Sequence, residues 1–229
     1  MIRFLTAGES HGKALTTIVD GFPSNLKISE NFINQQLKRR QFGYGRGLRM
    51  KIETDKAEIL SGVRFGKTLG SPISMLIRNS DWENWQTLMS VDPINEKIQK
   101  VTIPRPGHAD LVGVSKYNFD DIRNSIERSS ARETAARVAA GSIAKKLLEE
   151  FGISIGSFVE SIGGIYPEKN FSEKLFNNSI SSNFTGKLIS DKADKSSVRV
   201  LEDQHEEKII RKIKSAKKNG DTLGGTFIT

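Results

Sequence analysis

The stretch Arg128-Ser-Ser-Ala-Arg-Glu-Thr-Ala-Ala-Arg-Val-Ala-Ala-Gly141 carries the strongest structural signal in this chain. Ser130 and Glu133 are three residues apart, which is the capping-box spacing, so we expect Ser130 to begin a helix. Arg128 and Arg132 lie at this N-terminus, where backbone N–H groups and the helix dipole favour an anion such as phosphate. The alternative interpretation is an ordinary buried helix whose arginines face solvent.

The residues that follow continue with helical spacing and predict a helix over residues 130–151. The apolar residues that recur are Ala135, Val138, Ala139, Ile143 and Leu147. Many of the remaining positions hold alanine or glycine, which lets neighbouring elements approach closely. We therefore expect this helix to be central to the fold.

The composition is that of a globular protein. The chain has 229 residues, enough for one large domain or two small ones, and 36% hydrophobic residues permit a sizeable core. It contains no cysteine, which excludes disulfides and cysteine catalysis and favours a reducing compartment. The N-terminus turns polar too early for a signal peptide, and no apolar run approaches a membrane span. We therefore expect a cytoplasmic protein that does not bind membranes.

Positive charge narrows the classes of partner. The formal net charge is +8 and the pI is about 9.6, as in many proteins that bind nucleic acid, acidic membranes or anionic small molecules. The lysines of residues 208–218 are interpreted as the solvated face of a helix. The arginines instead cluster with glycine and serine at 39–49, 105 and 128–132, which favours recognition of phosphate or carboxylate groups.

Two histidines lie in short turn-like segments. His11 is flanked by Ser10 and by glycines in the turn 8–12, and a histidine there is suited to proton transfer near neutral pH. His108 follows Arg105 in a segment that two prolines stiffen, which suggests an acid placed beside an anion. The alternatives are a surface turn histidine and a structural turn, respectively. Asp110 either holds an imidazole or is a plain turn residue.

The loop 39–49 contains four arginines separated by glycines. A flexible glycine backbone with bidentate guanidinium groups can wrap around an anion. A basic loop for RNA is the alternative, since Tyr44 beside these arginines would suit base stacking, although no known RNA-binding motif is present.

Further elements are predicted from periodicity and turn residues. Strands are expected at 1–7, 14–19, 50–60, 72–78, 153–165 and 224–229, and helices at 29–40, capped by Ser29, and 204–219. Strands that follow one another through turns argue against a simple parallel nucleotide-binding fold. Residues 168–195 are interpreted as a variable surface segment, His205 as a surface residue, and Trp82 and Trp85 as structural.

Five motifs in one order carry a resemblance to a known family. They are Gly8-Glu9-Ser10-His11-Gly12, the loop from Arg39 to Met50, Ile59-Leu-Ser-Gly-Val-Arg-Phe-Gly66, Arg105-Pro-Gly-His-Ala-Asp110, and the stretch 128–141. From Thr6 to about Gly225 the chain closely resembles chorismate synthase. The resemblance implies an α+β fold, a layered β-α-β sandwich whose antiparallel sheets enclose central helices, with residues 1–229 as a single domain. It also implies a homotetrameric carbon–oxygen lyase of the shikimate pathway of aromatic amino acid biosynthesis.

The resemblance further implies a reaction and its cofactors. 5-Enolpyruvylshikimate-3-phosphate would lose phosphate in a 1,4-anti elimination to give chorismate, with reduced FMN (FMNH2) as the cofactor and NADPH as a candidate reductant of the flavin. Phosphate leaves more readily when it is protonated and surrounded by positive charge, which would give the arginine clusters a purpose. Neither a metal ion nor nucleic acid is expected as a partner.

Family roles carry over to the residues of the matching motifs. His11 resembles the histidine that handles a proton at the reduced flavin, and His108 resembles the acid that protonates the departing phosphate. Positions associated with the substrate are matched by Ser10, Arg40, Arg46, Arg49, Arg105, Ser130 and Arg132. Positions associated with FMN are matched by Arg128, Ser129 and Ser130, and Arg40 and Arg46 also match positions assigned to a nicotinamide phosphate.

The family pattern includes a later part that this sequence lacks. That part carries further flavin contacts, including a Lys-Pro-Ile-Ser-Thr-like segment, and an Arg-x-Asp motif whose aspartate helps in catalysis. We therefore expect the chain to be C-terminally incomplete, either as a fragment or as a truncated form. Two alternatives to the lyase stay open, an inactive remnant that binds anions and a basic RNA-binding module.

Overall fold

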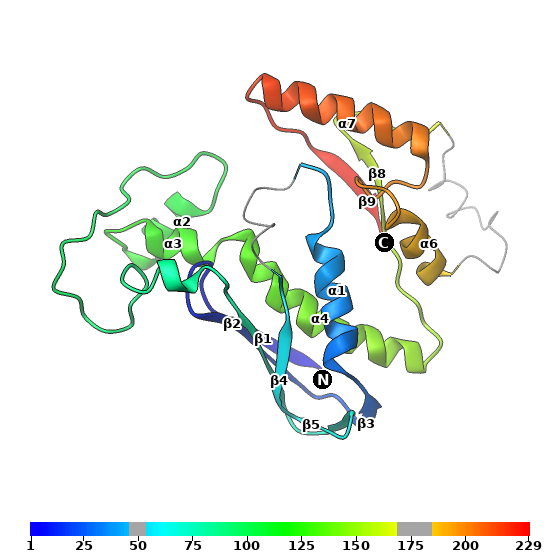
Figure 1. Ribbon diagram of the computed structural model, residues 1–229, viewed down its shortest axis with the longest axis horizontal. Helices are drawn as coiled ribbons and strands as arrows, with labels where there is room; N and C mark the ends of the chain where they lie inside the picture. Colours follow the sequence, from blue (N-terminus) through cyan, green and yellow to red (C-terminus); the bar gives the residue numbers. More distant parts are fainter. Residues whose placement is uncertain (46–53, 169–184) are drawn as a thin grey trace. The chain divides into compact units, whose positions relative to one another are not determined.

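The computed structural model describes residues 1–45, 54–168 and 185–229 (Figure 1). The chain divides into two compact units, the first made of residues 1–40 and 48–146 and the second of residues 41–47 and 147–229. Both units combine helices with antiparallel strands, so the predicted α+β class is confirmed. The enclosure of helices between two sheets and the single domain stay predictions. No helix in the described ranges is long and apolar enough to cross a membrane.

The first unit is built on a four-stranded antiparallel sheet in the order β1-β2-β7-β4. Its strands are β1 (Arg3–Ala7), β2 (Ala14–Asp20), β7 (Ile73–Arg78) and β4 (Ala57–Ser61). In register, Thr17 lies opposite both Thr6 and Met75. The strands predicted at 1–7, 14–19 and 72–78 are thereby confirmed. The strand predicted at 50–60 begins only at Ala57, and residues 50–53 of that prediction lie outside the described residues.

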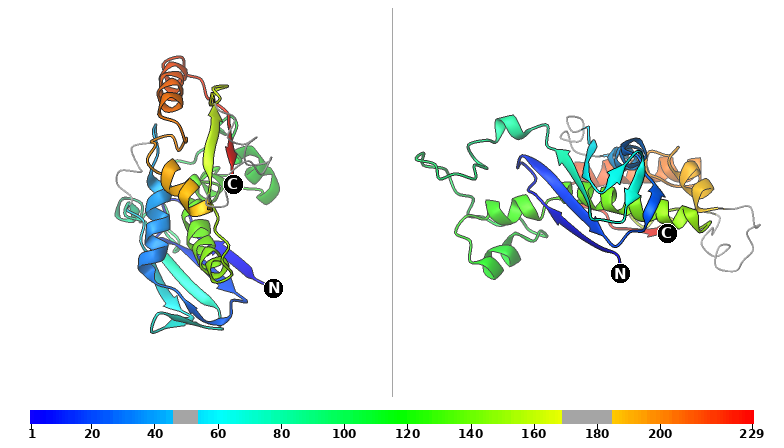
Figure 2. Two further views of the ribbon diagram at one scale, coloured as in Figure 1. Left: turned by 90° about the vertical axis from the view of Figure 1, so that its right-hand side faces the viewer. Right: turned by 90° about the horizontal axis from the view of Figure 1, so that it is seen from below.

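The core of the first unit lies on one face of this sheet, because alternate strand side chains point to the same face. The buried side chains of β2 and β7 are Leu15, Thr17, Val19, Ile73, Met75 and Ile77. Two helices, α1 (Glu30–Gln41) and α4 (Thr134–Glu150), lie side by side over the sheet in Figures 1 and 2. The face of α4 is mostly alanine, which brings its backbone close to its neighbours, and Ile33 and Leu37 of α1 are fully buried.

Side chains of α1 also protect the edge strand β4. Asn34 Oδ1 accepts the backbone N–H of Ala57 at 2.7 Å, and Glu30 Oε1 accepts that of Ile59 at 2.8 Å. These contacts satisfy backbone donors that an edge strand would otherwise leave unpaired. The predicted N-cap of α1 is confirmed, since the Ser29 hydroxyl accepts the N–H of Phe32 at 3.3 Å.

Several short elements of the first unit have no counterpart among the sequence predictions. A small sheet pairs β3 (Ser24–Lys27), β6 (Lys67–Leu69) and β5 (Val63–Arg64). A 3₁₀ turn η2 (Trp82–Asn84) follows β7, and the helices α2 (Asp110–Tyr117) and α3 (Arg123–Arg128) precede a second 3₁₀ turn, η3 (Ala131–Glu133). The long helix therefore begins at Thr134, after η3, and not at Ser130 as predicted.

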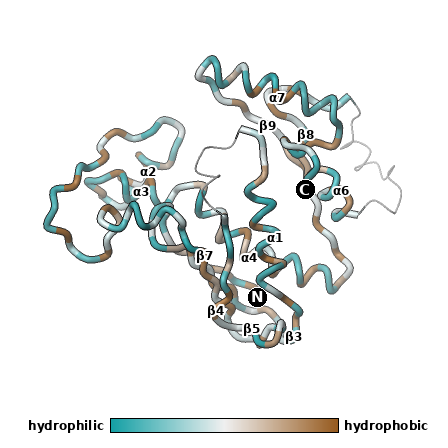
Figure 3. Tube along the Cα trace, viewed as in Figure 1, coloured by the Kyte–Doolittle hydropathy of each residue, from teal (hydrophilic) through white to brown (hydrophobic). Residues whose placement is uncertain are grey.

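The second unit pairs β8 (Phe158–Ile162) with β9 (Gly225–Ile228) and adds α6 (Gly186–Ala193) and α7 (Asp203–Lys218). Phe158 packs against Ile189 and Ala193 of α6. The helix predicted at 204–219 is confirmed, and much of α7 is hydrophilic in Figure 3, as expected for a solvated face. The interpretation of 168–195 as a variable surface segment is wrong for α6, which the Thr185 hydroxyl caps; residues 169–184 lie outside the described residues.

The prediction that His205 lies on the surface is wrong. The residue is 4% exposed, and its Nε2 lies 3.0 Å from the carbonyl oxygen of Ile165. A carbonyl oxygen only accepts, so this nitrogen carries a proton and donates. The acidic residues around His205 in the sequence indicated a solvated helix start, yet the first turn of α7 is covered in the fold.

Candidate active site

The turn between β1 and β2 needs glycine at its first position. Gly8 has a φ of +108°, and a Cβ at that position would lie 2.4 Å from the carbonyl oxygen of Ala14. The turn then brings Ser10 into the interior, where the side chain is buried and its backbone N–H donates to the carbonyl of Glu127 at 3.0 Å. The turn 8–12 is thus joined to the end of α3.

The Glu127 side chain holds His11 from two directions. Its Oε2 accepts the backbone N–H of His11 at 2.8 Å, and both carboxylate oxygens lie 2.9 Å from the imidazole Nδ1. The Glu127 side chain is only 2% exposed, whereas that of His11 is 20% exposed. The indole of Trp85 stacks on the imidazole with ring centroids 3.8 Å apart and an interplanar angle of 25°. The Glu127 carboxylate and the Trp85 ring face therefore both fix the imidazole plane.

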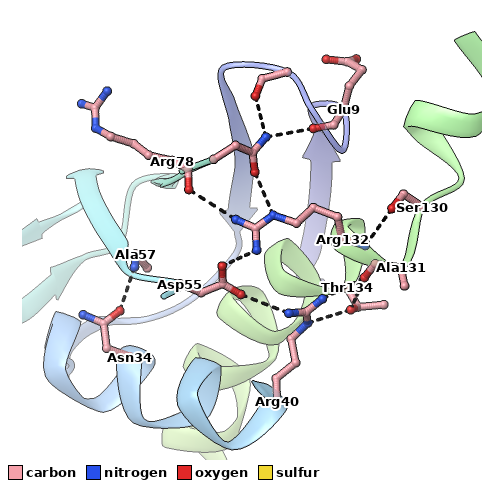
Figure 4. A network of polar contacts seen from close by, with 12 residues as sticks. Glu9, Asn34, Arg40, Asp55, Ala57, Arg78, Ser130, Ala131, Arg132 and Thr134 are labelled. Atoms are coloured by element: carbon pink, nitrogen blue, oxygen red, sulfur yellow. Dashed lines mark hydrogen bonds and ion pairs between the residues drawn. The ribbon is translucent and has the colours of Figure 1, made fainter. Parts of the chain in front are cut away.

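Arg132 lies in a buried polar network that joins four segments of the chain (Figure 4). Its guanidinium group pairs with Asp55, donates through Nε to Asn79 Oδ1 at 2.8 Å, and donates to the carbonyl of Arg78 at 3.3 Å. The same Asp55 carboxylate accepts from Arg40 at 3.1 Å, and Arg40 also donates to the Ala131 carbonyl at 2.9 Å. One buried carboxylate therefore holds two of the arginines that the sequence singled out.

Asn79 extends this network to the histidine turn. Its side-chain amide donates to the carbonyl of Glu9 at 3.1 Å and to that of Gly12 at 2.6 Å. Because Asn79 Oδ1 accepts from Arg132 at the same time, the turn 8–12 and the start of η3 share one side chain. The amide of Asn79 thus fixes the backbone on both sides of His11.

Arg105 forms a bidentate pair with Asp110. Its Nε and one terminal nitrogen donate to the two carboxylate oxygens at 2.9 Å each, and its backbone N–H donates to Oδ2 at 3.0 Å. The hydrogen bonds from the Arg105 guanidinium lower the pKa of Asp110 to about 2. The sequence leaves two roles open for Asp110, holding an imidazole or being a plain turn residue. The structure shows neither, because Asp110 pairs with Arg105.

His108 lies in the loop just before α2, between Arg105 and Asp110. The preceding Gly107 has a φ of +72°, and the imidazole Nδ1 of His108 lies 3.1 Å from the carbonyl oxygen of Pro106. That carbonyl only accepts, so Nδ1 carries the proton and Nε2 carries the lone pair of the neutral ring. The side chain is exposed. A ligand can therefore reach it, as general acid–base catalysis requires.

The segment 128–130 links α3 to η3. Arg128 donates to the carbonyl and the hydroxyl of Thr6 at 3.2 Å, and Ser129 donates to the carbonyl of Ser125 at 2.6 Å. Ser130 caps η3 by accepting the N–H of Arg132 at 3.3 Å.

The predicted capping box is only half correct. The Glu133 side chain does not reach back to Ser130 but accepts from Thr6 at 2.7 Å and from Arg137 at 2.8 Å. Burial raises the pKa of Glu133, but hydrogen bonds from Arg137 and Thr6 outweigh it and leave this pKa below its ordinary value. The tertiary partner Thr6 on β1 thus takes the carboxylate that the local motif would have used.

A cavity of about 740 Å³ lies beside these residues within the first unit. Glu127 and Ser129 line it, as does Ala109, the neighbour of His108. Its apolar lining includes Leu88, Met89, Val91, Val112, Tyr117 and Phe119, and its basic lining consists of Lys116, Arg123 and Arg128. This volume and this mixture of apolar walls with a few charged groups are typical of a small-molecule site.

The family model for chorismate synthase matches residues 2–229. The chain belongs to the chorismate synthase family. The chorismate synthase of Chlorobaculum tepidum is 56% identical over 228 residues, which are 98% of this chain and 56% of that protein. The chorismate synthase of Aquifex aeolicus is 55% identical, with 99% of this chain and 56% of that protein covered. A crystal structure of chorismate synthase matches with a TM-score of 0.76 and 46% identity over 99% of this chain and 56% of that one.

This chain spans little more than half the length of the chorismate synthases that it matches. Of the residues that the family motifs single out, Ser10 and His11 lie together at Glu127, and Arg40 and Arg132 lie together at Asp55. Arg105 and His108 share the loop before α2, and residues 128–130 follow α3 directly. Arg46 and Arg49 lie outside the described residues.

Sequence reasoning missed the side chains that hold the chorismate synthase motif residues in place. These are Asp55, Asn79, Trp85 and Glu127. The sequence predicts a structural role for Trp85, and its ring stacks on His11. For Glu127 the one available signal is that it directly precedes Arg128, the first residue of the motif 128–141.

Proposed function

We propose that this chain forms part of the active site of a chorismate synthase, which converts 5-enolpyruvylshikimate-3-phosphate to chorismate and phosphate by 1,4-anti elimination. Family membership supports this proposal. The observation that carries it from the geometry is the position of His11, held by Glu127, beside a 740 Å³ cavity that Glu127 and the neighbour of His108 both line. Two histidines, His11 and His108, suit a reaction that needs protons handled at two places.

The arginines of the site are proposed to bind the phosphate and carboxylates of the substrate. Of Arg40, Arg105 and Arg132, Arg105 has the most exposed side chain, with 44% exposed while Asp110 fixes its plane. Arg40 and Arg132 are 11% and 5% exposed and are held by Asp55, so their charge would act on the substrate from fixed positions. His108 has an exposed side chain and, in its imidazolium form with a second proton on Nε2, would protonate the departing phosphate.

Reduced FMN is the proposed cofactor, and the cavity residues fit it in chemical character. The apolar and aromatic walls suit a flat ring system, and Lys116, Arg123 and Arg128 suit a phosphate. When bound, the reduced flavin would supply electron density transiently, and this chain would provide its orientation and its electrostatic surroundings. Arg128, Ser129 and Ser130 are the proposed contacts, with Arg40 and Arg46 as candidates for the phosphate of NADPH.

The remaining features of the proposal concern the whole protein. A homotetramer in the cytoplasm, acting on a small-molecule substrate, follows from the family resemblance. The alternative of a basic RNA-binding module is not favoured, because the chorismate synthase family model matches residues 2–229 and Arg40, from the loop behind that alternative, is bound by Asp55.

The test is an anaerobic assay of the gene product read to its natural stop codon. Purified protein is mixed with 5-enolpyruvylshikimate-3-phosphate and chemically reduced FMN, and chorismate and phosphate are measured together. Equal amounts of both products are expected, and none without reduced flavin. Residues 1–229 alone are assayed in parallel to find whether this chain suffices. Absence of chorismate from the full gene product, with FMN shown to bind, would refute the proposed function.

A further inference from the structure

Glu127 is the closest charged partner of His11 in the described part of the chain, yet no family motif assigns it a role. We propose that Glu127 is a positioning residue that holds the neutral His11 imidazole in the tautomer with the proton on Nδ1, so that Nε2 exchanges protons with the bound ligand. This proposal deepens the proposed function and rests on it for the identity of the ligand.

The contacts of the carboxylate decide which nitrogen carries the proton. An ionised carboxylate only accepts, and both of its oxygens lie 2.9 Å from Nδ1, so Nδ1 must donate. The carboxylate is kept close to a positive charge, since an Arg123 nitrogen lies 4.0 Å from Oε1. Arg123 also lies over the Trp85 ring, 5.4 Å from its centroid, and Trp85 stacks on the imidazole. Ring, carboxylate and guanidinium are therefore mutually fixed.

The geometry also predicts what an amide would do in place of the carboxylate. The backbone N–H of His11 donates to Oε2 at 2.8 Å and needs an acceptor there. In a Glu127→Gln variant the amide oxygen would take this position and place the NH2 group where Oε1 now lies, 2.9 Å from Nδ1. This N–H donor competes for Nδ1 with the amide oxygen, which also lies 2.9 Å away, and the negative charge that favoured a proton on Nδ1 is gone, so the proton shifts towards Nε2. A hydrogen bond to a charged acceptor shifts such an equilibrium by about ten- to a hundredfold.

The chain is well suited to measuring this equilibrium because it contains only three histidines. Two of them serve as internal references, since His205 donates through Nε2 to a carbonyl and His108 donates through Nδ1 to another. In protein labelled with 15N-histidine, long-range proton–nitrogen correlation spectra report which ring nitrogen is protonated. The measurement is made at pH about 9, where an ordinary imidazole is neutral. His11→Gln and His108→Gln variants assign the signals.

For the wild-type protein we expect the His11 signal to match the Nδ1–H pattern of His108 and to differ from that of His205. Glu127→Gln is expected to lower the ratio of Nδ1–H to Nε2–H at least tenfold, whereas Glu127→Asp, which keeps the charge, should retain most of it. Glu133→Gln is the matched control, because it removes another largely buried carboxylate of the same region without a described contact to His11. It should leave the His11 pattern unchanged.

A wild-type His11 with the proton on Nε2, or with both nitrogens protonated at this pH, would overturn the proposal without any variant. An unchanged His11 pattern in folded Glu127→Gln protein would also overturn it. The kinetic counterpart in the full gene product is a fall in kcat that exceeds the change in KM for Glu127→Gln, partly recovered by Glu127→Asp. The spectra need no substrate, so failure to form chorismate would refute the proposed function and leave the tautomer assignment standing.

Discussion

Asp55 offers the clearest test of how the site is held together. Its side chain is completely buried between Arg132, which is 5% exposed, and Arg40, which is 11% exposed. Replacing one partner of a buried ion pair costs about 3–5 kcal/mol of unfolding free energy, because a charge is left buried without compensation. The Asp55→Asn variant keeps one acceptor oxygen, so we expect a loss of about 3 kcal/mol. For a chain of this size that corresponds to a fall in Tm of about 6–12 °C.

The assay is urea unfolding of the purified protein at 25 °C, followed by circular dichroism. Glu58→Gln is the matched control, because Glu58 also pairs with an arginine, Arg78 at 3.4 Å, but both side chains are more than half exposed. A surface pair of that kind contributes about 0–1 kcal/mol. Adding Arg132→Met should cost less in the Asp55→Asn background than in the wild type, with a coupling of about 0.5–3 kcal/mol. A loss below about 1 kcal/mol for Asp55→Asn, no larger than that of the control, would refute the role assigned to the buried carboxylate.

Three further predictions test other parts of the site. His108→Ala in the full gene product should lower kcat by about 10²–10⁴-fold with little change in KM, measured by steady-state chorismate formation, and an unchanged kcat would remove His108 from the mechanism. Because its pairing with Arg105 lowers the pKa of Asp110 from 3.8 to about 2, the stability from this pair is present above pH about 4 and is lost as the pH falls towards 2. Asp110→Asn should remove that part of the pH dependence of the unfolding free energy. If the unfolding free energy of the variant still falls between pH about 4 and 2 as in the wild type, Asp110 is not the group responsible. Gly8→Ala should destabilise the protein by more than about 1 kcal/mol, because its φ of +108° and the nearby Ala14 carbonyl leave no room for a Cβ. Gly141→Ala on α4, where a Cβ meets nothing within 4 Å, should instead stabilise the protein by up to about 1 kcal/mol. Both variants are measured by urea unfolding, and a change of the same sign in the unfolding free energy of both would contradict this prediction.

Local periodicity was enough to predict the longer elements. β1 alternates weakly, β7 is an apolar run, and α1, α4 and α7 repeat with helical spacing, so each could be found from its own residues. The six residues of α3 are too few for such a pattern, and α6 lies within a polar segment whose composition predicts a variable surface segment. The capping box failed at Glu133 because Thr6, on a strand far away in the sequence, competes for the same carboxylate.

The motif residues of the site could be named from the sequence, whereas their partners could not. His11 and Glu127 are 116 positions apart, and Asp55 and Arg132 are 77 apart, so no local pattern joins them. The partners are also common residue types, and an aspartate in a loop or a glutamate near the end of a short helix has no distinctive spacing. What selects them is burial next to a guanidinium or an imidazole, which only the fold determines.

The long separation between the turn 8–12 and Glu127 also has a consequence in time. During synthesis at about 5–20 residues per second, a partner 116 positions downstream is made roughly 6–23 s after the residue that needs it. Throughout that interval the nascent chain carries His11 without its carboxylate and Ser10 without the Glu127 carbonyl. β1, the turn and β2 can pair as a hairpin on the ribosome, but the imidazole acquires its orientation only after α3 has been translated. The order in which the ribosome delivers the segments therefore makes the contacts between His11 and Glu127 among the last of the first unit to form.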